Sequence, residues 1–205
     1  MIVGIYGGSF DPIHIGHLSI ATFAADSEIF DEVWMMVSPL NPLKGNHPPL
    51  FSDRQRLEMV RLATDTLTGV KVSDFEMNLP IPSYSFRTLS ELSKTFPDKN
   101  FRLITGADNL RDFTLWRNSR ELLMNFGLTV FPRPGVIVTS SMIIEIENRY
   151  QAPGTISYMA DAPRIDISSS QLRDMLSDPY DTRLDSLIPE VALRFIRTKG
   201  INTSA

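Results

Sequence analysis

Short apolar runs alternate with longer segments of helical periodicity along most of this chain. Each run is bounded by glycine, proline or polar residues, which is typical of buried strands in a parallel sheet. Five runs are expected to be strands: Ile2–Tyr6, Glu32–Ser38, Val70–Ser73, Phe101–Thr105 and Leu128–Phe131. Strands that alternate with helices pair in parallel through right-handed crossovers. The pattern therefore predicts the α/β class, with a doubly wound, Rossmann-like parallel sheet.

Helices are expected between and after these strands. Ser52 and Gln55 form a capping-box pattern, and Leu57, Val60, Ala63 and Leu67 then keep helical spacing. Further helices are expected at 18–24, 85–96 and 119–124, from Ser168, and from Pro189 to Gly200. Ligands of such a sheet bind at the carboxyl ends of its strands, near the point where strand order reverses. The first strand and the Phe101–Thr105 strand are expected to flank that crevice.

Two regions depart from the alternation. Residues 38–51 contain four prolines and are expected to form a loop near the site. After Pro134 the pattern becomes irregular until Ser168. We therefore expect one domain over 1–205, with a Rossmann-like core at 1–135. Residues 136–205 are expected to form an irregular segment followed by a small C-terminal helical region.

Composition narrows the classes of partner. The 205 residues carry a net charge of -4, which argues against a general nucleic-acid binder. No cysteine is present, so disulfides and thiolate metal sites are excluded. No apolar run approaches membrane-spanning length, and no charged and apolar leader begins the sequence. We expect a soluble, cytoplasmic protein; the sequence allows a homo-oligomer but does not determine one.

The richest chemistry follows the first expected strand, in residues 7–17. Gly7, Gly8 and Ser9 form a turn that lets backbone amides approach a phosphate, and the next helix presents its N-terminus there. His14 and His17 lie three positions apart at that helix start, so both imidazoles can face the same ligand. Each imidazole can donate a hydrogen bond to phosphate oxygens during phosphoryl transfer. The segment predicts a catalytic nucleotide site, and no metal site built from protein ligands is expected.

A second candidate phosphate site lies far along the chain. Ser168, Ser169 and Ser170 begin a helix that carries Arg173 in its first turns. Hydroxyl groups and an arginine at a helix N-terminus favour an anion. The same serines also fit an ordinary capping box, and capping is compatible with phosphate binding.

Together, Gly7–Pro12, His14–His17 and Ile167–Arg173 resemble the two signatures of the HxGH nucleotidyltransferase superfamily. Within it, the chain is most similar to bacterial nicotinate-nucleotide adenylyltransferases. The supporting segments are Pro82–Ser85, Thr88–Leu89, Gly106–Asn109, Trp116 and Pro132–Gly135. The resemblance, which covers nearly the whole chain, implies AMP transfer from ATP to nicotinate mononucleotide. The products are pyrophosphate and the dinucleotide precursor of NAD.

The resemblance also implies roles for particular residues. His14, His17 and Arg173 would be catalytic, with Arg173 and Ser169 on the outgoing pyrophosphate. Trp116 would stack on the pyridine ring, Asp108 would contact ribose or an amide, and Tyr84 and Ser85 would help to grip the nicotinate group. The full expected ATP and phosphate set is Gly7, Gly8, Ser9, Phe10, Gly16, Lys44, Arg133, Ser168 and Ser169, and the mononucleotide set is Tyr84, Ser85, Gly106, Asp108 and Trp116. Magnesium would arrive with ATP, held mainly by phosphate oxygens and water.

Several positions depart from the family pattern or stay open. Ser85 and Ser170 replace threonine, which keeps the hydroxyl and loses a methyl group. Leu43 stands before Lys44 where the family has histidine, so Lys44 is either a phosphate-binding cation or a solvated loop residue. Arg133 is either a nucleotide contact or a structural arginine. Preference for nicotinate or nicotinamide mononucleotide is not readable, because backbone amides can select the acid.

Other readings share the first motif. Phosphopantetheine adenylyltransferases and cytidylyltransferases are alternatives, although the former are typically shorter and lack the segment from Gly106 to Trp116. A class I aminoacyl-tRNA synthetase is disfavoured, because 205 residues leave little room for a tRNA-binding domain. A non-catalytic nucleotide sensor is a further alternative. His14, His17 and Arg173 argue against it, since a pure binder does not need all three.

Overall fold

A six-stranded, fully parallel sheet organises the chain. The computed structural model describes residues 1–39 and 48–199. The strands are β1 (Ile2–Gly8), β2 (Glu32–Val37), β3 (Val70–Ser73), β4 (Asn100–Gly106), β5 (Leu128–Phe131) and β6 (Ile156–Tyr158). Their order is β3-β2-β1-β4-β5-β6, with every neighbouring pair parallel. This confirms the predicted fold class, and it puts the reversal of strand order between β1 and β4.

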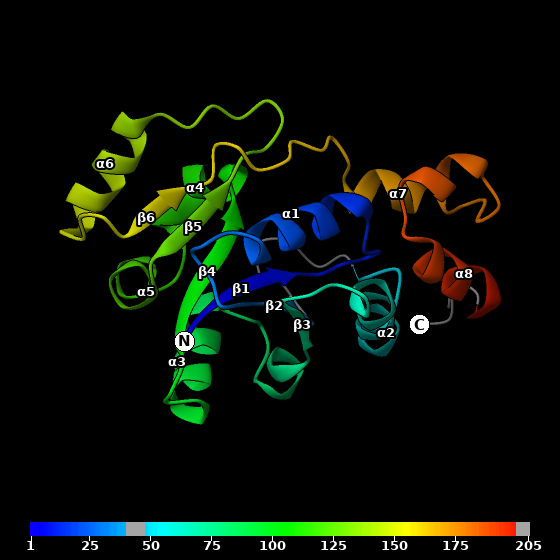
Figure 1. Ribbon diagram of the computed structural model, residues 1–205, viewed down its shortest axis with the longest axis horizontal. Coiled ribbons are helices and arrows are strands. Elements are labelled where there is room, and N and C mark those ends of the chain that lie inside the picture. Colours follow the sequence, from blue (N-terminus) through cyan, green and yellow to red (C-terminus); the bar gives the residue numbers. More distant parts are fainter. Residues whose placement is uncertain (40–47, 200–205) are drawn as a thin grey trace.

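Helices cover both faces of the sheet (Figure 1). They are α1 (Ile15–Ala25), α2 (Asp53–Thr64), α3 (Ser85–Thr95), α4 (Ala107–Asp112), α5 (Ser119–Phe126), α6 (Ser140–Tyr150), α7 (Ser169–Met175) and α8 (Glu190–Lys199). Short 3-10 turns occupy Phe75–Asn78, Phe113–Leu115 and Thr182–Ser186. No helix in the described ranges is long and apolar enough to cross a membrane.

Alternate residues of the inner strands supply two separate cores. On β2, Val33, Met35 and Val37 join the core beneath α1, α2, α7 and α8. Trp34 and Met36 join the opposite core beneath α3, α4, α5 and α6. A strand buried on both sides has no polar face to alternate, which explains why it reads as a continuous apolar run in sequence.

The expected strands and helices are present, α4 forms where a loop was expected after Gly106, and the 136–167 stretch is more regular than predicted. It contains α6, capped by Thr139, whose Oγ1 accepts a hydrogen bond from the Met142 amide (3.2 Å), and the edge strand β6. A three-residue strand is too short to show a period, so β6 had little sequence signal. Leu67 lies beyond α2, which ends at Thr64. Gly200, the expected end of the last helix, lies outside the described residues.

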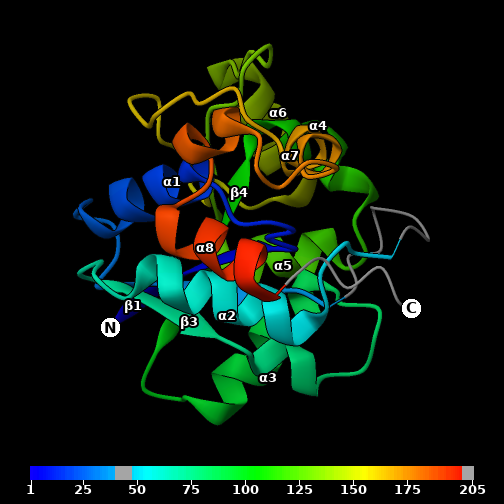
Figure 2. The ribbon, with the colours of Figure 1, turned by 90° about the vertical axis from the view of Figure 1, so that its right-hand side faces the viewer.

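The C-terminal helices pack back against the N-terminal half. Helix α8 lies beside α2, as both views show (Figures 1 and 2). The Ile15 amide at the start of α1 donates to the Leu187 carbonyl (3.0 Å), just before α8. This return of the chain brings α7, with its serines and arginine, to the N-terminal end of α1.

Candidate active site

Strand β1 continues through Gly7 and Gly8, so the turn expected at these glycines begins only at Ser9. Residues 7–12, here called the glycine turn, are shaped by a close contact between Gly8 and Phe10. A Cβ added at Gly8 would lie 2.9 Å from the Phe10 ring. Phe10 itself is 1% exposed and holds a left-handed backbone, with φ 46°. A non-glycine residue in that conformation is costly and is kept only where packing enforces it. Phe10 is therefore an anchor behind the loop, and Gly8 is the residue that leaves room for it.

His14 and His17 lie face to face at the start of α1. Their ring centroids are 3.6 Å apart and their planes differ by 26°. The His14 amide donates to His17 Nδ1 (3.3 Å), which fixes the orientation of the His17 ring. A Cβ at Gly16 would lie 3.0 Å from His14 Nδ1, so Gly16 provides the space that the His14 ring occupies. The two imidazoles lie together, as their spacing in the sequence predicted.

The His14 imidazole is neutral near pH 7. Burial, assisted by the positive charge of Arg133, lowers its pKa from 6.5 to about 4. Its Nδ1 is buried and has no hydrogen-bond partner among the described residues. A neutral imidazole has one donor and one acceptor nitrogen. The ring is thus suited to donate a single hydrogen bond to an anionic oxygen.

Helix α7 joins the glycine turn through contacts across the length of the chain. Ser169 Oγ donates to the Pro12 carbonyl (3.1 Å), and Arg173 Nη1 donates to the Asp11 carbonyl (3.0 Å). Ser168 caps the helix reciprocally with Gln171, so its hydroxyl accepts from the Gln171 amide (3.3 Å). Capping and proximity to the phosphate loop occur together here, as the sequence allowed.

The residues around this junction enclose a cavity of about 290 Å³, which we call the glycine-loop cavity. Its lining includes most of the predicted phosphate residues, namely Gly7, Gly8, Ser9, His14, His17, Arg133, Ser168, Ser169 and Arg173. Gly106 and Asp108, predicted for the mononucleotide, line this cavity too, and Arg133 Nε lies 3.7 Å from the Asp108 carboxylate. Phe10 and Gly16, which were also predicted for ATP, do not line the cavity but contact the lining residues Gly8 and His14. Lys44 and His47 lie outside the described residues.

A second cavity of about 370 Å³, here called the aromatic cavity, adjoins the first. Three predicted mononucleotide residues line it: Tyr84, Ser85 and Trp116. The two cavities share Gly7, Gly8, Ile104, Thr105 and Asn109, at the carboxyl ends of β1 and β4. They therefore form one cleft at the reversal of strand order, where the sequence placed it.

The aromatic cavity also has lining residues that the sequence did not reveal. Glu76 is 5% exposed and accepts hydrogen bonds from Ser38 Oγ (2.5 Å) and Thr88 Oγ1 (2.6 Å). Burial raises the pKa of the Glu76 carboxyl, although the two hydroxyl donors oppose that shift. Trp116 Nε1 and Ser83 Oγ are buried and have no hydrogen-bond partner in the described chain. Glu76 lies in an irregular segment between β3 and α3, where no periodicity indicates its burial.

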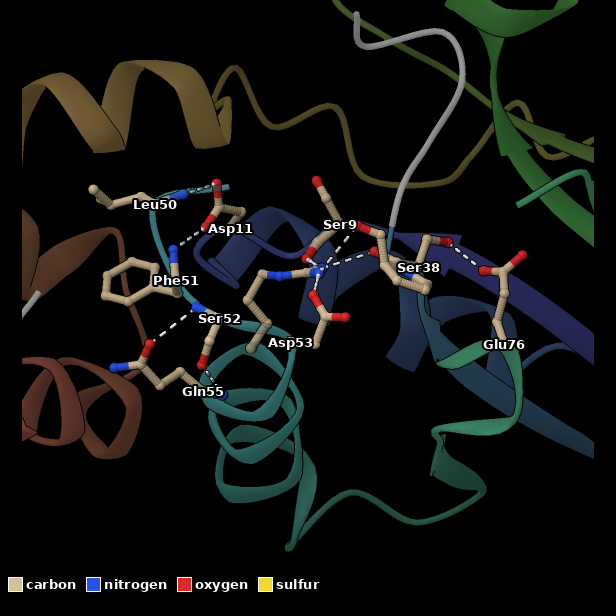
Figure 3. A network of polar contacts seen from close by, with 11 residues as sticks. Ser9, Asp11, Ser38, Leu50, Phe51, Ser52, Asp53, Gln55 and Glu76 are labelled. Atoms are coloured by element: carbon tan, nitrogen blue, oxygen red, sulfur yellow. Dashed lines mark hydrogen bonds and ion pairs between the residues drawn. The ribbon is translucent and has the colours of Figure 1, made fainter. Parts of the chain in front are cut away.

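Arg56 is fully buried and holds backbone segments next to the cleft in place. Its Nη1 donates to the carbonyls of Ser9 (2.5 Å) and Ser38 (2.9 Å), and its Nη2 pairs with Asp53 (2.6 Å; Figure 3). These bonds give two backbone carbonyls a charged donor inside the protein. The guanidinium thereby fixes the glycine turn relative to the end of β2. A sequence signal existed, because Arg56 is in helical register with Met59, Val60 and Ala63.

Asp11 provides a second support. Its carboxylate accepts the amides of Leu50 (2.9 Å) and Phe51 (3.0 Å), as Figure 3 shows. The carboxylate is also 3.6 Å from Arg173 Nη1. Asp11 therefore ties together the turn after β1, the segment before α2, and helix α7.

Comparison with known proteins agrees with this geometry. A cytidylyltransferase-like family model matches residues 5–175. A Bacteroides fragilis protein named "Probable nicotinate-nucleotide adenylyltransferase" is 41% identical over 98% of this chain and 94% of its own length. A Flavobacterium johnsoniae protein of the same name is 37% identical, covering 96% of each chain.

Solved structures share the fold at lower identity. Plasmodium falciparum nicotinic acid mononucleotide adenylyltransferase, complexed with NaAD, superposes with a TM-score of 0.77 at 18% identity. The match covers 97% of this chain and 95% of that one. The same enzyme complexed with APC also gives a TM-score of 0.77.

Proposed function

The chain belongs to the cytidylyltransferase-like family and, within it, to the nicotinate-nucleotide adenylyltransferases, and we propose that it transfers AMP from ATP to nicotinate mononucleotide. The products are pyrophosphate and nicotinate adenine dinucleotide, which serves NAD biosynthesis. The observation that carries this assignment is the two-part cleft. One part offers phosphate-binding groups, the other offers aromatic walls for a planar ring, and the glycine turn joins them.

The reaction needs positioning and charge neutralisation more than a protein nucleophile. A phosphate oxygen of the mononucleotide forms a bond to the α-phosphorus of ATP, and the bond from that phosphorus to the bridging oxygen of pyrophosphate breaks. The attacking phosphate is already anionic at neutral pH, so no covalent enzyme intermediate is required. The glycine-loop cavity can hold the triphosphate in line with the attacking oxygen.

The paired imidazoles are proposed to contact the triphosphate. The neutral His14 donates one hydrogen bond, and His17, oriented by the His14 amide, approaches from the adjacent position. Such donors stabilise charge that moves onto the leaving oxygen in the transition state. Both are proposed as catalytic residues.

The positive side of the site is proposed to receive the leaving pyrophosphate. Arg173 and Ser169 line the glycine-loop cavity from α7, and Arg133 lines it from the segment after β5. Arg173 is held by its bond to the Asp11 carbonyl, so its guanidinium is oriented before the ligand arrives. Pre-orientation reduces the cost of ordering an arginine on binding.

Magnesium is proposed to enter with ATP. Within residues 1–39 and 48–199, no three histidine or acidic side chains gather as metal ligands. The donor set therefore suits an ion that keeps phosphate and water ligands. When bound, the ion would neutralise charge on the phosphates.

One catalytic domain is proposed for the whole chain. The family model spans 5–175, and α7 contributes its arginine to the loop after β1. Because α7 contacts the loop after β1, the N-terminal and C-terminal parts of the chain are expected to fold together as one domain.

The direct test supplies the chain with ATP, magnesium and nicotinate mononucleotide. We expect equimolar pyrophosphate and dinucleotide, with formation of both requiring the mononucleotide. Binding of ATP without product from any pyridine mononucleotide would instead identify a nucleotide sensor and refute the proposal.

A further inference from the structure

Two arginines flank Tyr84, but only one of them faces the aromatic cavity. The guanidinium carbon of Arg117 lies 5.0 Å from the Tyr84 ring centroid, and that of Arg87 lies 5.7 Å from it. Arg87 donates to the Pro80 carbonyl (2.8 Å), and it is absent from the cavity lining. Arg117 lines the cavity, and its guanidinium makes no ion pair or hydrogen bond with any described residue. A cation without an anionic partner in the described chain is thus presented to the ligand space.

Two unused hydrogen-bond donors line the same cavity, on the residues next to Tyr84 and Arg117 in sequence. Trp116 Nε1 and Ser83 Oγ are both buried and unpartnered within the described ranges. Helix α3 starts beside them at Ser85, and its N-cap residue, Tyr84, provides no side-chain cap. The first turn of α3 also has no acidic residue, so its positive end is not neutralised locally. These features together favour a negatively charged group.

The cavity lining also includes an acidic side chain. Glu76 is the acidic residue among the cavity's lining side chains, and both of its oxygens already accept hydroxyl hydrogen bonds. The lining therefore combines the Arg117 cation and unused donors with a carboxyl group whose two oxygens each already accept a hydrogen bond. A pyridine mononucleotide carries a cationic ring nitrogen, and a nicotinate ring adds an anionic carboxylate. An unpaired cation together with unused donors complements the acid better than the neutral amide.

We propose that Arg117 is a specificity-determining residue that selects the mononucleotide bearing a ring carboxylate over the corresponding amide. This inference rests on the proposed function and specifies how its acceptor is chosen. A guanidinium and a carboxylate form a charge-assisted hydrogen bond, which contributes more than the neutral bond that an amide oxygen would make. Contact with Tyr84 orients the guanidinium toward the cavity without neutralising it.

The test compares Arg117→Met with the matched control Arg87→Met. Each variant removes one guanidinium from the Tyr84 ring and keeps an unbranched apolar stem. With ATP saturating, kcat/KM is measured for nicotinate and for nicotinamide mononucleotide. Arg117→Met is expected to lower the acid-to-amide ratio of kcat/KM about tenfold. Arg87→Met is expected to leave that ratio within about twofold.

Ionic strength supplies a second readout. Raising salt should increase KM for the acid in the wild-type protein and have a weaker effect in Arg117→Met, because screening acts on the removed charge pair. Equal losses for acid and amide in Arg117→Met would mean that Arg117 only packs against Tyr84, and would overturn the inference. A ratio shifted equally by Arg87→Met would also overturn it. If wild-type protein adenylylates neither mononucleotide, the proposed function fails and this inference fails with it.

Discussion

The guanidinium of Arg173 donates to the backbone carbonyl of Asp11 at 3.0 Å, joining residues that lie 162 positions apart. The Asp11 carboxylate, 3.6 Å from the same nitrogen, meanwhile holds the amides of Leu50 and Phe51. Both candidate phosphate motifs thus meet at one buried residue, which contributes its backbone carbonyl and its carboxylate. Asp11 is a positioning residue, because it acts through the groups that face the ligand.

Replacement of Asp11 by Asn should weaken both the fold and the reaction. An amide keeps the shape of the carboxylate, but one of its two terminal atoms donates and cannot accept a backbone N–H. We expect unfolding free energy to fall by about 1–3 kcal/mol, the cost of a buried donor left without its acceptor. The KM for ATP should rise because Arg173 loses its charge pairing with the Asp11 carboxylate (3.6 Å), although its bond to the Asp11 backbone carbonyl remains. Chemical denaturation and steady-state kinetics measure the two effects.

Asp74→Asn is the matched control. Asp74 also pairs with an arginine, Arg61 (3.3 Å), but both side chains are 52% exposed. Exposed pairs of this kind contribute little, so stability should change by less than about 0.5 kcal/mol. If Asp11→Asn behaves like Asp74→Asn in both assays, then Asp11 does not hold the site together.

His17→Ala should lower turnover by orders of magnitude while the fold stays intact. The side chain is only partly buried, whereas His14 beside it is 3% exposed. Loss of a preorganised donor to the transition state typically costs a factor of about 10²–10³ in kcat. Rapid-quench turnover and thermal unfolding, compared with wild type, separate activity from folding. Turnover within a few-fold of wild type would show that the phosphates bind elsewhere.

Acid should destabilise the protein through His14. Its folded-state pKa of about 4 lies below the ordinary 6.5, so the unfolded chain binds the extra proton first. The stability from neutral His14 is fully present above pH 6.5 and is lost as pH falls toward 4, by at most roughly 3.5 kcal/mol. We expect the difference in unfolding free energy between wild type and His14→Asn to shrink across that window. A difference independent of pH would contradict the buried neutral state.

Trp116→Ala should raise KM for the mononucleotide more than KM for ATP. Trp116 lines the aromatic cavity and is absent from the lining of the glycine-loop cavity. Trp116→Phe is the conservative partner, since it keeps a stacking ring and removes the unpartnered Nε1–H. We expect Phe to recover most of the affinity lost in Ala. Equal increases of both KM values in Trp116→Ala would assign the indole a structural role.

The sequence predicted the parts of this molecule that repeat a local rule. Runs such as Leu128–Phe131 match β5, and Ser52 and Ser168 cap their helices as their spacing indicates. It did not predict Glu76 or Arg117 in the cleft, because these positions depend on where an irregular segment and a loop meet in space. Arg56 is an intermediate case. Its helical register with buried residues indicates burial, but the sequence does not show which carbonyls its side chain contacts.

Glu76→Gln should become relatively more stable as pH rises. Burial raises the pKa of Glu76 above its ordinary value of 4.5, so the folded state holds its proton to higher pH than the unfolded state does. Stability from the neutral carboxyl is therefore full at low pH and declines as pH rises through the raised pKa. The Gln variant is neutral throughout and can still accept one hydroxyl bond through its carbonyl. Unfolding free energies from pH 4 to pH 8 should move in favour of the variant.

Glu32→Gln should show the opposite dependence of stability on pH. Partial burial disfavours the Glu32 carboxylate, but hydrogen bonds from Lys71 and Trp34 and the nearby lysine charges outweigh burial and lower its pKa. Its contribution should therefore appear above pH 4.5 and vanish as pH falls through the lowered pKa. As pH rises, the unfolding free energy of the wild type should increase relative to that of Glu32→Gln. It should decrease relative to that of Glu76→Gln. Parallel slopes in the two variants would mean that Glu76 is ionised in the folded cleft, which would place a full negative charge in the cavity that Arg117 also lines.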